Sequence, residues 1–224
     1  MTPTTTFKAK RVFLVDDHPL VREWLTNLIN QQPGLNVCGE AESGPEAREK
    51  ILALRPDIAI VDIALKDSSG IELIKDLKQS HPEVAVLVLS MHEESHYAER
   101  ALRAGARGYV MKRETTKKVI AAIHQVLAGR LCVSEAVSNV MAAQFVEGKT
   151  LATRSPVEQL SDRELEVFEL LGEGRTTRQI AETLRVSLKT VQAYCARIKE
   201  KLNLGSATEL LREAVRWHES THRG

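Results

Sequence analysis

Three aspartates stand where short apolar segments of this 224-residue chain end. Asp16 and Asp17 follow the segment Arg11–Val15, and Asp62 follows the segment Ile58–Val61. Near-continuous apolar segments of this length are typical of strands in a parallel sheet that helices cover on both faces. Ligands of such sheets bind beyond the carboxyl ends of the strands. The pattern therefore predicts that the three carboxylates meet at one edge of a sheet.

Carboxylates brought this close repel one another and raise one another's pKa unless a cation joins them. Oxygen ligands suit Mg²⁺, which keeps several waters and also contacts phosphate oxygens. A magnesium site at this edge is therefore the first functional prediction. Two more polar residues end strands in the same way, since Ser90 follows Val86–Leu89 and Lys112 follows Gly108–Met111. The edge should thus carry a hydroxyl and an ammonium as well.

Strands and helices are expected to alternate through the first half of the chain. The expected strands are Arg11–Val15, Val37–Ala41, Ile58–Val61, Ala85–Leu89 and Gly108–Met111, and the expected helices are Leu20–Asn30, Pro45–Leu54, Ile71–Gln79, Glu94–Ala104 and Thr115–Leu127. This alternation predicts βαβ units with right-handed crossovers, and hence a doubly wound α/β domain. Taken singly, each polar residue except Asp62 is better explained as a cap, a turn former or a surface group. Taken together, that explanation needs several coincidences.

Four motifs stand at these strand ends. They are Val15-Asp16-Asp17-His18-Pro19, Val61-Asp62 with Gly70 downstream, Leu89-Ser90, and Gly108-Tyr109-Val110-Met111-Lys112. In this order and spacing they resemble the receiver domain of two-component response regulators, over about 125 residues, an ordinary size for one domain. The resemblance implies a five-stranded parallel sheet in the flavodoxin-like order 2-1-3-4-5.

The same resemblance implies a role for each acid. Asp62 would be the phosphoacceptor, and a sensor histidine kinase would be the phosphodonor. Asp17 and Asp62 would hold Mg²⁺ through their side chains and Asp16 mainly through water. The backbone carbonyl of Ala64 would supply a further ligand.

Three other residues would respond to the phosphoryl group. Lys112 would pair with one phosphoryl oxygen, and Ser90 would hydrogen-bond another. Tyr109 would then turn inward behind Ser90. Phosphoryl transfer asks the protein mostly for positioning and charge neutralisation, so these residue types suit the reaction.

The second half of the chain has no strand pattern. A helix is expected over Ser134–Phe145, followed by a linker rich in turn formers. The capping box Ser161-Asp162-Arg163-Glu164 should open a helix that Gly172-Glu173-Gly174 ends. Three further helices are expected, over Thr177–Leu184, Leu188–Leu202 and Ala207–Trp217.

Charge is segregated in this half, although the whole chain carries a formal charge of only +1. Residues 174–202 hold seven basic and two acidic side chains, and residues 158–173 hold six acidic and one basic. A basic face with an acidic flank fits docking onto DNA phosphates. Charge alone, however, is better explained by an ordinary solvated face.

Sequence motifs favour DNA binding more strongly than charge does. They are Leu160-Ser161-Asp162-Arg163-Glu164, Glu166-Val167, Gly174, Gln179-Ile180-Ala181, Leu184, Ser187, Lys189-Thr190-Val191 and Lys201-Leu202. This set resembles the LuxR-type helix-turn-helix that ends response regulators of the NarL/FixJ subfamily. A helix-turn-helix places its second helix in the major groove.

That resemblance implies a set of DNA contacts on the long helix. Gln192, Ala193 and Ala196 would face bases, because Gln pairs with adenine and Ala meets the thymine methyl. The hydroxyl of Tyr194 would reach a phosphate, although a packing role explains it equally well. Contacts to DNA phosphates would come from Lys189, Thr190, Arg197, Lys199 and Lys201.

The chain therefore divides into an expected receiver at residues 7–129, a helical linker at 130–157 and a DNA-binding domain at 158–224. No apolar segment reaches membrane-spanning length and no signal peptide is visible. Three scattered cysteines without metal spacing fit reduced thiols, so a cytoplasmic location is expected. A homodimer should bind an inverted repeat in double-stranded DNA.

A switched regulator of this kind is not expected to be an enzyme. Two other functions are compatible with part of the sequence. A Mg²⁺-dependent phosphohydrolase with Asp62 as nucleophile would explain the acids but not the second half. A DNA-binding protein with a vestigial receiver would explain the second half but not the full set of polar strand ends.

Overall fold

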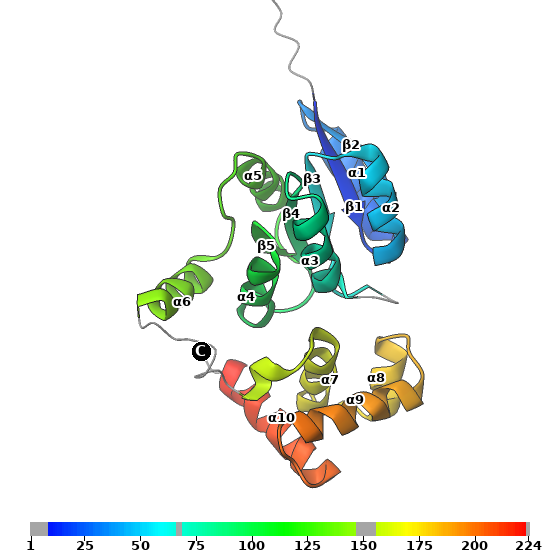
Figure 1. Cartoon of the computed structure of the whole chain (residues 1–224), viewed down its shortest axis with the longest axis vertical. Helices are drawn as coiled ribbons and strands as arrows, with labels where there is room; N and C mark the ends of the chain where they lie inside the picture. Colours follow the sequence, from blue (N-terminus) through cyan, green and yellow to red (C-terminus); the bar gives the residue numbers. More distant parts are fainter. Residues whose placement is uncertain (1–8, 66–68, 147–155, 223–224) are drawn as a thin grey trace, which may run out of the picture. The chain divides into compact units, whose positions relative to one another are not determined.

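The computed structural model describes residues 9–65, 69–146 and 156–222. The chain divides into two compact units, residues 1–147 and residues 148–224. Figure 1 shows the elements of each unit, and each unit has its own buried core.

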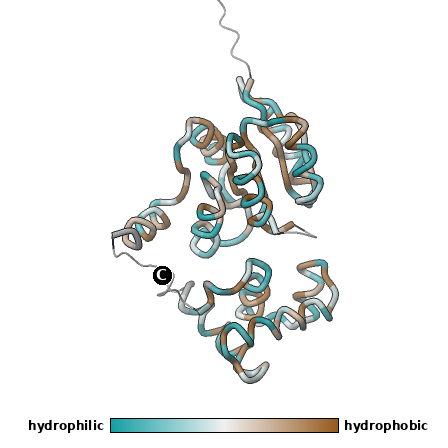
Figure 2. Tube along the Cα trace, in the orientation of Figure 1, coloured by the Kyte–Doolittle hydropathy of each residue, from teal (hydrophilic) through white to brown (hydrophobic). Residues whose placement is uncertain are grey.

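The first unit is built on five parallel strands that pair in the order β2-β1-β3-β4-β5. Their bounds are β1 (Lys10–Val15), β2 (Leu35–Ala41), β3 (Ile58–Val61), β4 (Ala85–Ser90) and β5 (Gly108–Met111). The doubly wound order expected from the sequence is thereby confirmed. Figure 2 shows hydrophobic residues running through the strands, as the apolar segments predicted.

Helices cover both faces of this sheet. They are α1 (Pro19–Asn30), α2 (Gly44–Leu54), α3 (Gly70–Ser80), α4 (Glu94–Ala104) and α5 (Thr116–Leu127). Successive strand residues point to opposite faces. Val12 and Leu14 of β1 share one core with Leu25 of α1 and Ile123 of α5, so α1 and α5 lie on the same face. The helices α2, α3 and α4 pack side by side on the other face.

The chain beyond α5 folds back along the outer edge of the sheet. Cys132 forms a parallel bridge with Gly108 of β5. The backbone N–H of Tyr109 donates to the carbonyl of Cys132 at 2.8 Å, and the N–H of Cys132 donates to the carbonyl of Arg107 at 2.9 Å. The sequence showed no strand pattern here, so this edge pairing is a finding of the structure.

Helix α6 (Glu135–Val146) follows this bridge and packs against α4. The backbone N–H of Ser134, just before α6, donates to Glu94 Oε1 at 2.7 Å. Residues 130–157 were predicted to form a helical linker. The structure places residues 130–146 of that segment in the first unit, and residues 147–155 lie outside the described part of the chain.

The second unit is entirely helical over its described residues. A 3₁₀ turn (Pro156–Gln159) precedes α7 (Asp162–Gly172), α8 (Thr177–Thr183), α9 (Leu188–Lys201) and α10 (Ala207–His222). The expected capping box is present, since the Ser161 side chain accepts from the N–H of Glu164 while the Glu164 side chain accepts from the N–H of Ser161. A Cβ at Gly172 would lie 2.6 Å from the carbonyl oxygen of Ala214, so a side chain there would separate α7 from α10.

Candidate phosphoacceptor and DNA-binding sites

The register of the sheet brings the acidic residues together. Val15 pairs with Val61, so the residues that follow β1 and β3 emerge side by side. Asp62 and Asp16 are each only 3% exposed. The N–H of Asp62 donates to the carbonyl of Val15 at 2.8 Å, which fixes the point where β3 ends. The predicted meeting of the carboxylates at one sheet edge is therefore observed.

Lys112 connects two of these carboxylates. Its Nζ lies 2.6 Å from Asp62 Oδ2 and 2.6 Å from Asp16 Oδ2. The lysine side chain is only 8% exposed. Lys112 directly follows β5, and its N–H donates to the carbonyl of Ser90 at the end of β4. This hydrogen bond positions the lysine at the carboxyl edge of the sheet.

Burial and charge act in opposite directions on this ion pair. Burial raises the pKa of Asp62 above its usual value, the Asp16 charge adds to the increase, and Lys112 opposes it. Burial lowers the pKa of Lys112, but the charges of Asp62 and Asp16 outweigh it and leave that pKa above its usual value. Because one ammonium faces two buried carboxylates with a third nearby, the site favours a further positive charge.

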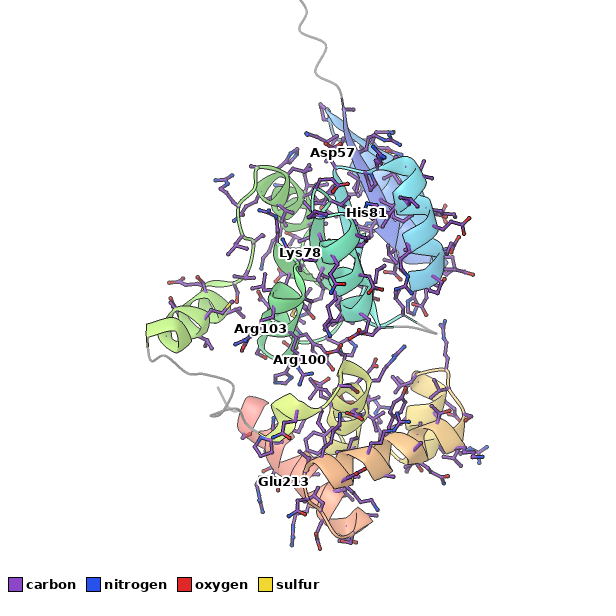
Figure 3. The ribbon with its side chains drawn as sticks, in the orientation of Figure 1. Asp57, Lys78, His81, Arg100, Arg103 and Glu213 are labelled. Carbon is purple, nitrogen blue, oxygen red and sulfur yellow. The ribbon has the colours of Figure 1, made fainter. Side chains whose placement is uncertain are left out.

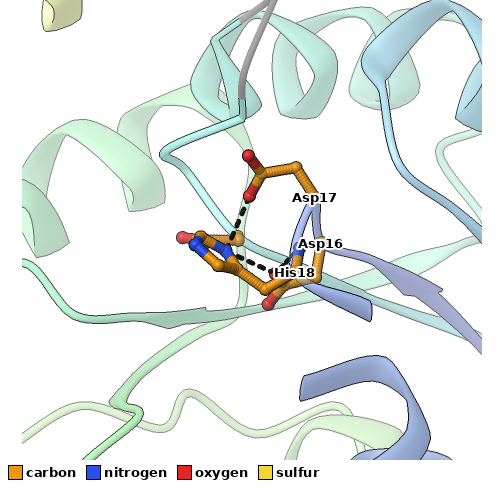
Figure 4. Close-up of side chains that lie close together, drawn as sticks. Asp16, Asp17 and His18 are labelled. Carbon is orange, nitrogen blue, oxygen red and sulfur yellow. Dashed lines mark hydrogen bonds and ion pairs between the residues drawn. The ribbon is translucent and has the colours of Figure 1, made fainter. Parts of the chain in front are cut away.

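The donor set of this site fits a cation. Asp16, Asp17, His18 and Asp62 each offer one ligand atom, and the four atoms lie within 4.8 Å of one another. Carboxylate oxygens are the ligands that Mg²⁺ takes in proteins. Figure 4 shows the His18 ring bonded to both neighbouring carboxylates. These contacts of His18 were not predicted from the sequence.

Gly70 allows α3 to begin against the backbone of the acceptor. A Cβ at Gly70 would lie 2.1 Å from the carbonyl oxygen of Asp62 and 2.6 Å from Cα of Ile63. The N–H of Ala64 donates to Asp62 Oδ1 at 3.2 Å. The loop after β3 therefore holds the Asp62 carboxylate from one side while Lys112 holds it from the other.

The hydroxyl belongs to the last residue of β4, and the loop that follows contacts the predicted switch tyrosine. Ser90 is fully buried, and its Oγ accepts a hydrogen bond from the N–H of His92 at 3.3 Å. Tyr109 lies inward, and its hydroxyl donates to the carbonyl of His92 at 3.0 Å. The His92 ring packs on Tyr97 of α4, with centroids 4.7 Å apart.

A cavity of about 330 Å³ opens beside the ion pair. Its lining is largely apolar. It comes from α1, from the segment just before α1, and from the residues that follow β4 and β5. The residues are His18, Val21, Trp24, Met91 and Lys112. This cavity gives Lys112 access to the outside, although its side chain is mostly buried.

In the second unit, α8 and α9 form the predicted helix-turn-helix. Arg185 in the turn has φ of 53°, a left-handed conformation that reverses the chain. Ser187 caps α9 by accepting from the N–H of Thr190 at 3.0 Å. Val191 and Ile198 of α9 are buried, so the opposite face of the helix points outward.

That outward face carries most of the predicted DNA contacts. The exposed members are Lys189, Gln192, Ala193, Ala196 and Arg197, while Thr190, Tyr194 and Lys199 are half-buried. Gln192, Ala196 and Lys199 also line a cavity of about 230 Å³ together with residues of α7, α8 and α10. The DNA contacts themselves stay a prediction.

Lys201 has a partner inside the domain. Its Nζ lies 2.6 Å from Glu164 Oε2 and donates to the carbonyl of Gln159 at 3.3 Å. Burial raises the pKa of Glu164, but the hydrogen bonds from Lys201 and Ser161 outweigh it and hold that pKa below its usual value. Lys201 thus links the end of α9 to the start of α7, a contact that the sequence analysis did not predict.

A doubly wound sheet with acids and a lysine at its strand ends, followed by a separate helix-turn-helix unit, defines the class of response regulators. Comparison with known families agrees. Residues 12–124 match the response regulator receiver domain, and residues 158–214 match the bacterial regulatory proteins of the luxR family. The chain belongs to the NarL/FixJ-type response regulators, which confirms the resemblance found in the sequence.

Individual relatives span nearly the whole chain. Response regulator GacA of Pseudomonas viridiflava is 34% identical over 206 residues, which cover 92% of this chain and 95% of the relative. Oxygen regulatory protein NreC of Staphylococcus haemolyticus is 32% identical over 210 residues, covering 92% and 97%.

Solved structures agree with this assignment. The response regulator RcsB of Salmonella typhimurium is 25% identical, with a TM-score of 0.62, covering 93% of this chain and 98% of that chain. RcsB from Salmonella enterica serovar Typhimurium, bound to promoter rprA with the phosphomimetic BeF3-, is 26% identical with a TM-score of 0.58, covering 91% and 97%. Among the described residues, no helix is long and apolar enough to cross a membrane.

Proposed function

We propose that this chain is a transcription regulator that phosphorylation of Asp62 switches between two DNA-binding states. The observation that carries the proposal is the buried Asp62 carboxylate, held at 2.6 Å from the Lys112 ammonium at the carboxyl edge of the sheet. An acceptor carboxylate needs a neighbouring cation, because phosphorylation adds nearly two negative charges.

The proposed chemistry is transfer of a phosphoryl group to Asp62. A carboxylate oxygen of Asp62 attacks phosphorus and forms an acyl phosphate, while the bond from phosphorus to the imidazole nitrogen of a histidine kinase breaks. Lys112 then pairs with a phosphoryl oxygen. Its ammonium already lies beside Asp62, so little reorganisation is needed.

Magnesium is the proposed cofactor. Asp17, Asp62 and, through water, Asp16 would hold it, with the Ala64 carbonyl as a further ligand. Lys112 contacts Oδ2 of both Asp16 and Asp62, and one ligand atom of each lies within 4.8 Å of one from Asp17. Bound Mg²⁺ supplies positive charge to the phosphoryl oxygens.

We propose that the signal leaves the site through the loop after β4. Ser90 Oγ would donate to a phosphoryl oxygen, which would draw the start of this loop toward Asp62. The carbonyl of His92 accepts from Tyr109, so Tyr109 would follow the loop. Tyr109 already lies inward in this structure, which is the arrangement expected of the switched form.

The output is sequence-specific binding of double-stranded DNA by α9. Gln192, Ala193 and Ala196 lie on its outward face, where they would read bases in the major groove. Arg197 and Lys189 would hold phosphates. The solved structure of RcsB on promoter DNA supports this proposal for a relative of the same architecture. A DNA target also implies a cytoplasmic location.

A homodimer on an inverted repeat is the proposed assembly. Leu210 and Ala214 of α10 are buried within the unit, and Trp217 packs on Phe168. Leu211 remains 44% exposed on the same helix. We propose that Leu211 contacts the second copy, which would place two α9 helices about 34 Å apart on one face of the DNA.

The test is labelling of the full chain with radiolabelled acetyl phosphate in the presence of Mg²⁺. Asp62→Asn should abolish labelling because an amide does not form an acyl phosphate. Asp57→Asn is the matched control, since Asp57, labelled in Figure 3, precedes the same strand at its other end. Its carboxylate pairs with Lys10. Labelling of Asp62→Asn at the wild-type level would refute the proposed acceptor.

The two alternative functions give different results in the same experiment. A phosphohydrolase would turn over small phosphate esters many times, whereas a switch would retain one phosphoryl group per chain. A vestigial receiver would take no label at all. A DNA footprint with and without acetyl phosphate then shows whether phosphorylation changes DNA binding.

The DNA surface is tested by binding at two salt concentrations to matched and scrambled sites. Gln192→Ala should relax specificity at one base position, at a cost of roughly 1–3 kcal/mol if the contact is bidentate. Arg197→Ala should weaken binding to every sequence and flatten the salt dependence, because it removes one phosphate contact. Lys75→Ala, an equal charge change on α3, is the control.

A further inference from the structure

The cavity beside the ion pair is lined by large apolar side chains that the core leaves exposed. Its volume is about 330 Å³. Trp24 of α1 is 37% exposed, and Met91, just after β4, is 68% exposed. Apolar and aromatic side chains gathered around a concave surface, with a charged group among them, are typical of small-molecule sites. An apolar cavity of about 150 Å³ is large enough to hold benzene, so this one has room for a phenyl ring or a short alkyl chain.

One side of α1 forms a wall of this cavity. His18, Val21 and Trp24 are spaced three residues apart from the N-cap of the helix onward, so they lie on one side of it. Val21 also packs against the core of the sheet, which fixes this wall in place. Met91 and Lys112 line the cavity from the carboxyl ends of β4 and β5. Lys112 belongs to the ion pair as well, so the cavity adjoins the phosphoacceptor site.

The charges at this site would orient a phosphate-bearing molecule in one direction. Its phosphoryl group would face Lys112 and the acidic cluster, where bound Mg²⁺ offsets the negative charge. In-line transfer places the leaving group on the far side of phosphorus from Asp62. The cavity leads from Lys112 to the outside. An apolar leaving group would therefore lie in the cavity, against Trp24 and Met91.

We propose that this cavity binds the apolar acyl group of a small-molecule phosphodonor, an acyl phosphate with an alkyl or aromatic chain longer than acetyl. The inference rests on the proposed phosphorylation of Asp62 and adds a class of donor to it. An oxygen of the Asp62 carboxylate forms a bond to phosphorus, and the bond from phosphorus to the acyl oxygen breaks. The electron pair of that bond stays on the acyl oxygen. The leaving group departs as a carboxylate and takes no proton.

The apolar lining suits this leaving group better than the alcohol of a phosphate ester. A carboxylic acid has a pKa of about 4, so its anion is stable at neutral pH without a general acid. An alkoxide would need a proton, which Val21, Trp24 and Met91 do not offer. The same side chains gain from removing methylenes from water. Each buried methylene is worth up to roughly fourfold in a binding or rate constant.

The test compares acetyl phosphate with butanoyl phosphate as donors to the full chain in the presence of Mg²⁺. The second-order rate constant of labelling is measured for each donor, and the ratio of the butanoyl to the acetyl constant is compared between variants. This comparison cancels the intrinsic reactivity of the two donors. The test variant combines Trp24→Ala with Met91→Ala. Leu52→Ala is the matched control, because Leu52 is an apolar side chain of α2 that is 57% exposed.

The ratio should fall roughly 4–16-fold in the double variant, because butanoyl has two more methylenes than acetyl and each contributes about two- to fourfold. Leu52→Ala should keep the wild-type ratio. Butyl phosphate, an ester with a chain of the same length, should give no label, and labelling by it would contradict the assigned leaving group. A double variant that loses both rate constants by the same factor would show general support of the site and would overturn the proposal.

Tryptophan fluorescence observes the cavity directly. In a Trp217→Phe background, Trp24 is the remaining tryptophan of the chain. The probe is 2-oxopentylphosphonate, in which a methylene replaces the bridging oxygen of butanoyl phosphate and prevents transfer. It should change the Trp24 emission at lower concentration than 2-oxopropylphosphonate, the matching analogue of acetyl phosphate. Equal half-saturation concentrations for the two probes would count against a chain-binding cavity.

Asp62→Asn separates this proposal from the one on which it rests. If acetyl phosphate labels Asp62→Asn as well as the wild type, or labels neither, the proposed phosphoacceptor fails. If labelling requires Asp62 but neither the rate ratio nor the Trp24 emission depends on chain length, only the role of the cavity is overturned.

Discussion

Replacing Lys112 with methionine should destabilise the first unit by about 3–5 kcal/mol at neutral pH, the cost of removing one partner from a buried ion pair. The ammonium lies 2.6 Å from both Asp16 and Asp62, and all three side chains are almost completely buried. Methionine keeps most of the length of the aliphatic stem, so the loss reports mainly on charge. Two carboxylates would remain buried without their cation.

The loss of stability in Lys112→Met should depend on pH in a defined direction. Burial already raises the pKa of Asp62, and removal of Lys112 raises that pKa further. A carboxyl whose pKa is higher in the folded state than in the unfolded state destabilises the fold once pH exceeds the folded value. The deficit of Lys112→Met should therefore be present at neutral pH and should shrink as pH falls through the raised pKa of Asp62.

The wild type should show the opposite behaviour at high pH. The pKa of Lys112 lies above its usual value of 10.5 in the folded chain. Its contribution to stability is therefore complete below that value and is lost as pH rises through the folded pKa. Added Mg²⁺ should narrow the deficit of Lys112→Met, because a bound cation replaces part of the missing charge.

The assay is urea unfolding followed by fluorescence. The chain has two tryptophans, so a Trp217→Phe background leaves Trp24 of α1 to report on the first unit. Lys118→Met is the matched control, since Lys118 pairs with Glu114 at 2.6 Å but its side chain is 55% exposed. That control should lose only about 0.3–0.5 kcal/mol. Equal losses of unfolding free energy in the two variants would refute the reasoning. So would a loss in Lys112→Met that does not change with pH.

Three further predictions follow from contacts elsewhere. Gly70→Ala should cost roughly 1–3 kcal/mol in urea unfolding and weaken Mg²⁺ binding, because the added Cβ would collide with the Asp62 carbonyl. Lys201→Met should lower the free energy of unfolding by about 1 kcal/mol at pH values above the lowered pKa of Glu164, because solvent screens the half-exposed lysine. In urea unfolding this difference should vanish as pH falls through that pKa. Glu94→Ala should speed amide hydrogen exchange at the start of α6, because Ser134 loses its acceptor, while unchanged protection there would contradict the contact.

Most of the phosphoacceptor site was predictable because it depends on where strands end. Apolar segments define strands, parallel strands end at one edge, and the next residue then lies in the site. Asp16, Asp62 and Lys112 follow strands in this way, and Ser90 is the last residue of β4. The structure brings the ammonium of Lys112 into contact with Asp16 and Asp62. Helix bounds were predictable for a similar reason, as the capping box at Ser161 marks its helix start in both sequence and structure.

The remaining features depend on tertiary contacts that leave no periodic signal. The bridge of Cys132 to β5 is one residue long, so no alternation of polar and apolar residues announces it. The pairing of Lys201 with Glu164 joins positions far apart in the chain. From the sequence, the basic side chain of Lys201 was assigned to a DNA phosphate instead.

The loop after β4 explains how a small change at Asp62 could reach the segment that leads to the second unit. Ser90 lies at the site, and two residues later His92 binds both the Ser90 hydroxyl and the Tyr109 hydroxyl. Two residues further, Glu94 opens α4 and accepts from the backbone of Ser134 before α6. A packed loop moves as a unit more readily than it stretches. Any shift of Ser90 toward a phosphoryl group should therefore move Glu94 too, and the α6 attachment would register it before any DNA is bound.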